Sequence, residues 1–285
     1  MALNPRVTKR SFENAFAMAQ ASGLAYADEA AIREGIVEAI GAPLRDFRIF
    51  AIPTQGTSVF LALFDEAIVV SFQGTKVVAN WLTNFQIALV PFRGGGLIHF
   101  GFRQALDTVY PDIERTLQEW SGQGRTLWVT GHSLGGALAL LCAAYLRFPA
   151  DPTTTLPRPI AGLYTFGQPR VGTHDFCNAC EGNFGTYFFR YVNKQDIVTR
   201  VPPRILAYWH TDGIEYITQA GTIEDDPAWW QIFLDSVHGG IDALARLQIA
   251  EPITDLVADH ACNAYIAAIS AVVEKGATPE VPPDV

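Results

Sequence analysis

A short apolar run that passes into a helix through a glycine-rich turn constrains this chain more than any other feature. Residues 127–130 read Leu-Trp-Val-Thr, a β-branched and aromatic run that predicts a buried strand. Residues 137–146 are apolar on every side and rich in good helix formers, which predicts a buried helix. Only residues 131–136, Gly-His-Ser-Leu-Gly-Gly, separate the two.

The turn has the pattern Gly-x-Ser-x-Gly, with Ser133 at its centre. Between a strand and a helix this pattern is the nucleophile elbow of hydrolytic enzymes, in which a strained backbone exposes the serine hydroxyl. Gly131 and Gly135 are needed because a Cβ at either position would not fit so tight a turn. We therefore predict Ser133 as a nucleophile and expect His132 to pack beside it; the alternative is a chance glycine–serine turn.

The length, the order of predicted elements and the net charge of the chain limit its domain number, its fold class and its electrostatic partners. We expect a single domain over residues 1–285, with a flexible tail from about residue 275. Strand patterns alternate with helix patterns, which predicts an α/β fold with a mostly parallel sheet covered on both faces. The net charge of −9 argues against nucleic acid and anionic membrane surfaces as electrostatic partners.

No apolar run suits a signal peptide or a transmembrane segment, so we expect a soluble chain. Its compartment stays open, because secretion with removal of a leader would leave no trace in this sequence.

Hydropathy patterns assign most of the remaining segments. Helical patterns cover residues 11–26, 30–40, 105–120 and 261–273. Strand patterns cover residues 47–52, 58–64, 67–72, 160–166 and 188–192, and residues 208–216 read as strand and turn. The first two strands are joined by a turn at Thr54-Gln-Gly56, which predicts a hairpin. Ser11 is placed as an N-cap, and Gly41 closes the second helix.

The four cysteines are too few to imply a disulfide framework in a chain of this length. Cys177 and Cys180 have the spacing of half a zinc site or of a redox pair. No second cysteine pair and no histidine pair has metal-ligand spacing, so we expect ordinary thiols, no metal and no cofactor.

Several stretches together resemble the class 3 (fungal-type) triacylglycerol lipases of the α/β-hydrolase fold. They are Ser71-Phe-Gln-Gly-Thr75, Asn80-Trp81, His99-Phe-Gly-Phe102, Gly131-His-Ser-Leu-Gly-Gly136, Thr165-Phe-Gly-Gln-Pro-Arg-Val-Gly172, Asn193-Lys-Gln-Asp-Ile-Val198 with Pro202-Pro203, and Asp259-His260. They occur in the family's order, and their combination is specific although no single stretch is. The resemblance implies a central, mostly parallel sheet with helices on both faces and a short helical lid.

A serine hydroxyl is a poor nucleophile, so a base must take its proton and a carboxylate must hold that base. In this fold the chain order is serine, acid, histidine. Asp196 lies in a loop after a predicted strand, and the resemblance makes it the acid; an Asx-turn residue is the alternative. His210 matches a structural position of the family, which leaves His238 and His260, and the resemblance favours His260 as the base.

The tetrahedral intermediate of ester hydrolysis needs donors for its oxyanion. We expect the backbone N–H groups of Leu134 and Thr75 to supply them, with the Thr75 hydroxyl as a further donor. The chance alternative is that Gly74 and Thr75 merely end a strand.

Residues 76–85 then continue with helical spacing and a wide apolar face, which predicts a lid that also contacts substrate. The lid residues are Val77, Val78, Trp81, Leu82 and Phe85.

These inferences predict a carboxylic ester hydrolase that forms an acyl-serine intermediate. The resemblance implies a triacylglycerol lipase, with acylglycerol substrates and transient contact with a lipid–water interface. A non-lipolytic carboxylesterase or feruloyl esterase of the same fold is the alternative. A catalytically silent binding module is disfavoured, because nothing structural requires Ser133, Asp196 and His260 together.

Overall fold

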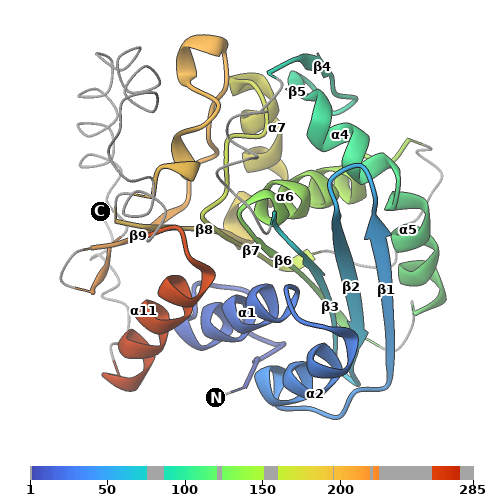
Figure 1. Ribbon diagram of the computed structural model, residues 1–285, viewed down its shortest axis with the longest axis vertical. Helices are drawn as coiled ribbons and strands as arrows, with labels where there is room; N and C mark the ends of the chain where they lie inside the picture. Colours follow the sequence, from blue (N-terminus) through green and yellow to red (C-terminus); the bar gives the residue numbers. More distant parts are fainter. Residues whose placement is uncertain are drawn as a thin grey trace.

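The computed structural model describes residues 2–75, 87–120, 124–150, 160–194, 196–218, 221–224 and 259–276. Within them, eight strands form one sheet in the order β1-β2-β3-β6-β7-β8-β9-β10, with helices on both faces (Figure 1). The strands are β1 (Asp46–Ile52), β2 (Thr57–Leu63), β3 (Ala67–Phe72), β6 (Thr126–His132), β7 (Ile160–Phe166), β8 (Phe188–Asn193), β9 (Ile214–Ile217) and β10 (Ile223–Glu224).

The middle of the sheet is parallel, as the sequence predicts. Parallel pairing joins β3 to β6, β6 to β7, β7 to β8 and β8 to β9. The edges are antiparallel, with the predicted hairpin of β1 and β2 on one side and β9 with β10 on the other. The carboxyl ends of parallel strands meet at one edge of a sheet, which is where α/β proteins place their sites.

Two hydrophobic cores cover the two faces. Side chains alternate along β3, so that Ile68 and Val70 enter one core while Ala67 and Val69 enter the other. The first core contains side chains from α4 (Phe100–Asp107), α5 (Tyr110–Glu119), α6 (Leu134–Arg147) and α7 (His174–Phe184). The second contains side chains from α1 (Phe12–Leu24), α2 (Glu29–Ile40) and α11 (Cys262–Glu274).

Helices α1 and α11 lie side by side although they stand near opposite ends of the chain (Figure 1). The helix ends follow the predicted caps. The hydroxyl of Ser11 accepts the Asn14 N–H at 3.2 Å, and Gly41 ends α2 in the left-handed conformation with φ 71°. The end of α1 lies against the start of α11, since a Cβ on Gly23 would lie 2.9 Å from Cδ1 of Ile266 and 3.6 Å from Sγ of Cys262.

The single helix predicted over residues 105–120 is wrong, because the chain there forms α4 and α5 with a break between Asp107 and Tyr110. Pro111 explains the break. It is the second residue of α5, and a proline has no N–H to donate to the carbonyl of Asp107. A helix could not have continued through it without losing that bond.

Other described elements have no counterpart among the sequence predictions. They are α7, β10, the small antiparallel sheet of β4 (Leu89–Pro91) and β5 (Leu97–His99), and the 3₁₀ turns η1 (Gly185–Tyr187), η2 (Val198–Arg200) and η3 (Arg204–Leu206). The predicted lid residues Val77, Val78, Trp81, Leu82 and Phe85, together with His238 and the tail beyond residue 276, lie outside the described residues.

All four cysteines are free thiols, and three of them are buried. Cys177 and Cys180 on α7 are therefore not joined by a disulfide bond. Within the described stretches, none of the helices has the length and apolar character needed to cross a membrane.

Candidate active site

Ser133 occupies the turn between β6 and α6 with φ 60° and ψ −130°, a conformation that is strained for any residue other than glycine. The flanking glycines make the turn sterically feasible. A Cβ on Gly131 would lie 2.2 Å from the carbonyl oxygen of Gly135, and one on Gly135 would lie 2.1 Å from that of Phe72. The predicted strand, tight turn and buried helix are confirmed, and the strain is the kind expected of a nucleophile elbow.

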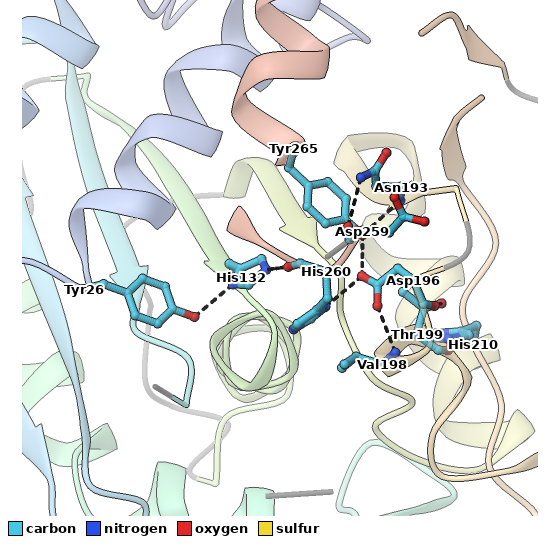
Figure 2. A network of polar contacts seen from close by, with 10 residues as sticks. All are labelled: Tyr26, His132, Asn193, Asp196, Val198, Thr199, His210, Asp259, His260 and Tyr265. Atoms are coloured by element: carbon cyan, nitrogen blue, oxygen red, sulfur yellow. Dashed lines mark hydrogen bonds and ion pairs between the residues drawn. The ribbon is translucent and has the colours of Figure 1, made fainter. Parts of the chain in front are cut away.

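The structure brings Asp196 and His260 together from opposite parts of the sequence. Asp196 follows β8, His260 precedes α11, and both side chains are buried. The Nδ1 of His260 lies 2.8 Å from Oδ2 of Asp196 (Figure 2). An ionised carboxylate only accepts, so this contact places the proton on Nδ1 and leaves Nε2 of the neutral ring as the basic nitrogen.

Two further donors hold the Asp196 carboxylate (Figure 2). The backbone N–H of Val198 donates to Oδ1 at 2.8 Å, and the hydroxyl of Tyr265 donates to Oδ2 at 2.6 Å. The same hydroxyl accepts the N–H of Asn193 at 2.9 Å, so α11 is tied directly to the end of β8. The carboxylate therefore has little freedom to turn away from His260.

The atoms that would react are Oγ of Ser133 and Nε2 of His260. Both are buried, and neither has a hydrogen-bond partner among the described residues. The base lies next to the elbow, since the rings of His132 and His260 have centroids 4.6 Å apart. In sites without substrate, catalytic hydrogen bonds are often long and tighten only during the reaction.

Gly167, which follows β7, shapes the space around this pair. It has φ 61°, and a Cβ there would lie 2.7 Å from Oδ2 of Asp196 and 2.8 Å from Nδ1 of His260. Any side chain at this position would push the acid and the base apart. The glycine within Thr165-Phe-Gly-Gln-Pro is thus explained by its close approach to the pair.

The ring of His132 is buried and bonded at both nitrogens. Nε2 lies 2.6 Å from the backbone carbonyl oxygen of His260, and Nδ1 lies 2.9 Å from the hydroxyl of Tyr26 (Figure 2). Burial, with the nearby His260 as the second cause, lowers the pKa of His132 to about 3, so the ring is neutral. The packing role expected for His132 agrees with these contacts, whereas Tyr26 carries no signal that sequence reasoning could use.

The predicted oxyanion donors lie on the two segments beside Ser133. Leu134 is the first residue of α6, so its N–H has no acceptor within the helix. Thr75 follows β3, and its buried hydroxyl has no hydrogen-bond partner in the described part of the chain. A Cβ on Gly74 would lie 2.5 Å from the carbonyl oxygen of His132, which shows how closely this loop approaches the elbow.

Gln73 stabilises the same loop from the side of β2. Its side-chain oxygen accepts hydrogen bonds from the hydroxyls of Thr57 and Ser58 at 3.1 Å and 3.2 Å. The Thr57 hydroxyl also lies 2.7 Å from the backbone carbonyl oxygen of Gln73. These contacts form a polar link between β2 and the end of β3.

Two other histidines make structural contacts. The Nδ1 of His99 accepts the backbone N–H of Phe102 and caps α4, and Nε2 of His210 contacts the carbonyl oxygen of Thr199 at 2.5 Å. Burial lowers the pKa of His210 well below its usual value, so it too is neutral. No group of three potential metal ligands occurs among the residues that the structure describes.

Comparison with known proteins agrees with this geometry. The profile of the Lipase (class 3) family matches residues 69–206, which include most of β3, the serine turn and Asp196. A secreted mono- and diacylglycerol lipase of Fusarium solani is 37% identical over 166 residues, 56% of this chain and 46% of that protein. A lipase of Rhizomucor miehei is 34% identical over 158 residues, 53% of this chain and 42% of that protein.

This chain thus spans less than half the length of either of these relatives. Among solved structures, lipase II from Rhizopus niveus superposes with a TM-score of 0.62 at 25% sequence identity, covering 73% of this chain and 81% of that one. The predicted α/β-hydrolase fold agrees with this likeness and with the parallel sheet.

Proposed function

Because this chain belongs to the class 3 lipase family, we propose that it is a carboxylic ester hydrolase that works through an acyl-serine intermediate. Ser133 is the nucleophile, His260 the base and Asp196 the acid. The observation that carries the proposal is the buried, hydrogen-bonded pair of Asp196 and His260 beside a strained serine turn. We also propose that residues 1–285 act as one catalytic domain.

The chemistry follows from the proton positions. Nε2 of His260 takes the proton of the Ser133 hydroxyl as Oγ attacks the ester carbonyl, and the imidazolium is stabilised by Asp196 at Nδ1. The same proton then goes to the leaving alcohol, which leaves an acyl group on Ser133. A water molecule, activated by His260, releases the acid and restores the serine.

The oxyanion that forms in each step needs preset donors. The N–H of Leu134 opens a helix, where the dipole also favours negative charge. The N–H and hydroxyl of Thr75 supply the remaining donors from the loop that Gln73 and Gly74 keep against the elbow. Hydrogen bonds from these donors strengthen only as negative charge develops on the substrate oxygen. They therefore lower the activation barrier more than they tighten substrate binding.

For the substrate, we propose acylglycerols presented at a lipid–water interface. The support is the family and the names of its members, which include a mono- and diacylglycerol lipase. The apolar lid residues Val77, Val78, Trp81, Leu82 and Phe85 support the same proposal at the level of sequence. The competing function is a non-lipolytic esterase with the same triad.

A hydrolysis profile separates the two functions. The protein is assayed on p-nitrophenyl esters of increasing acyl length and on emulsified triglyceride and diacylglycerol, with Ser133→Ala as the blank. A lipase hydrolyses the emulsions and retains activity on long acyl chains. Activity confined to dissolved short-chain esters would contradict the lipase proposal and leave the esterase.

A further inference from the structure

The hydroxyl of Tyr26 lies where three parts of the site meet. Tyr26 follows α1, and its oxygen is 2.9 Å from Nδ1 of His132, the residue before the nucleophile. It is also 2.3 Å from where a Cβ on Gly74 would stand, so the oxyanion loop contacts it directly. Burial raises the pKa of Tyr26, opposed by a backbone hydrogen bond from Gly74, and the hydroxyl therefore keeps its proton.

The direction of each hydrogen bond in this chain of contacts is determined. The carbonyl oxygen of His260 can only accept, so Nε2 of His132 carries the hydrogen of that 2.6 Å contact. Nδ1 of the neutral ring then has a lone pair, and the Tyr26 hydroxyl donates to it. Without this donor, His132 could adopt its other tautomer, whose Nε2 lone pair would repel the His260 carbonyl.

His260 is consequently held at several points. His132 binds its backbone carbonyl and covers its ring, with an angle of 33° between the two ring planes. Asp196 binds Nδ1, and the backbone of Gly167 lies against the Nδ1 and Cε1 atoms. Figure 2 shows the two arms of this network, one leading from His260 through His132 to Tyr26 and the other through Asp196 to Tyr265.

We propose that Tyr26 and His132 are positioning residues that set the base His260 and the oxyanion loop relative to Ser133. This proposal rests on the proposed function. The Tyr26 hydroxyl fixes the tautomer of His132, His132 fixes the backbone of His260, and the same hydroxyl keeps Gly74 beside the elbow. A packing role alone would require the ring of Tyr26 but not its hydroxyl.

The first test replaces Tyr26 with phenylalanine and uses Tyr145→Phe as the matched control. Tyr145 lies on α6, outside the network around His260, and its hydroxyl donates a hydrogen bond to Oδ1 of Asp107 at 2.7 Å. Each variant therefore loses one tyrosine hydrogen bond. On a dissolved p-nitrophenyl ester, we expect Tyr26→Phe to lower kcat about tenfold with KM unchanged, because one buried hydrogen bond is lost. Tyr145→Phe should keep the wild-type kcat.

The second test examines the other link with two variants of His132. A glutamine amide can place its nitrogen near the position of Nε2 and still donate to the His260 carbonyl, whereas asparagine reaches only the position of Nδ1. We therefore expect His132→Gln to keep more of kcat than His132→Asn. Thermal midpoints measured for all variants ensure that the rates compare folded proteins.

The outcomes separate this proposal from the function on which it rests. A wild type without esterase activity, or an active Ser133→Ala, would overturn the proposed function and the positioning roles with it. With an active wild type and an inactive Ser133→Ala, the positioning roles are overturned if Tyr26→Phe keeps the wild-type kcat. They are equally overturned if Tyr145→Phe loses as much, or if the two His132 variants have the same kcat.

Discussion

The serine turn and the acid–base pair are stabilised by different means. Around Ser133 the turn depends on two glycines of one short motif, because Gly131 and Gly135 leave room for backbone atoms of the turn and of Phe72 at distances that no Cβ would permit. Around His260 the contacts are hydrogen bonds to distant parts of the chain, with Asp196 64 residues away and His132 128 residues away. One half of the site is encoded locally and the other is assembled by the fold.

This difference indicates how each half should respond to substitution. The turn depends on the absence of side-chain atoms, so it is sensitive to any added Cβ and insensitive to distant polar residues. The acid–base pair depends on particular donors and acceptors from η2, β6 and α11. Its geometry should change when one hydroxyl, carboxylate or imidazole is removed while the fold remains intact.

The largest expected effect is at the base. His260→Ala should lower kcat on a p-nitrophenyl ester by about a millionfold, because Ser133 loses the group that takes its proton. His238→Ala, which alters the other histidine that chain order allows, should remain active. An active His260→Ala with an inactive His238→Ala would identify His238 as the base. The pair of Asp196 and His260 would then not be the acid and base of the site.

The next largest effect is at the acid. Asp196→Asn keeps the shape of the side chain but no longer requires the proton on Nδ1 of His260, and kcat should fall by about ten-thousandfold. Asp107→Asn is the matched control, because Asp107 also accepts a tyrosine hydroxyl but lies outside the site. A loss below tenfold for Asp196→Asn would mean that this carboxylate does not orient the base.

The contrast between the halves also explains what the sequence could predict. The strand, turn and helix around Ser133 follow from local patterns, and so do the hairpin of β1 and β2 and the caps of α1 and α2. The role of Asp196 and the choice of His260 over His238 came from resemblance to a family. No local pattern links residues that are far apart in the chain.

Tyr26 illustrates the limit most clearly, since its partner His132 lies 106 residues away. Helix α7 was missed for another reason, because its sequence, His-Asp-Phe-Cys-Asn-Ala-Cys-Glu-Gly-Asn-Phe, is rich in weak helix formers. Tertiary packing of Phe176 and Cys180 in the core compensates for this low propensity. The break at Pro111, in contrast, was visible in the sequence.

A smaller effect is expected at the oxyanion loop, which joins the two halves. Thr75→Val removes a hydroxyl but keeps the backbone N–H, so kcat should fall by up to about a hundredfold to a thousandfold with little change in KM. Steady-state kinetics on a dissolved ester measure both constants. An unchanged kcat would show that the hydroxyl does not bind the oxyanion.

The last expected effect is on stability rather than on kcat, and it concerns the dependence of stability on pH. The folded protein keeps His132 neutral to a pKa of about 3, whereas the unfolded chain protonates it at about 6.5. The contribution of this neutral ring is complete above pH 6.5 and decreases as pH falls toward 3, by about 1.4 kcal/mol for each pH unit.

Urea unfolding of the wild type and of His132→Asn between pH 4 and pH 7 measures this term, because His210 titrates in both proteins and cancels in the difference. The free energy of unfolding of the wild type should fall more steeply with acid than that of the variant. Parallel curves would mean that His132 is not kept neutral by burial.

Covalent labelling tests the central claim most directly. A p-nitrophenyl alkylphosphonate transfers its phosphonyl group to an activated serine and releases p-nitrophenolate, and the modified residue can be located by mass spectrometry of the tryptic peptide 126–147. The account predicts one phosphonyl group per chain, carried by Ser133, with loss of activity in proportion and no labelling of Ser133→Ala or His260→Ala. Labelling of another residue, or equal labelling of His260→Ala, would contradict a serine activated by the pair of Asp196 and His260.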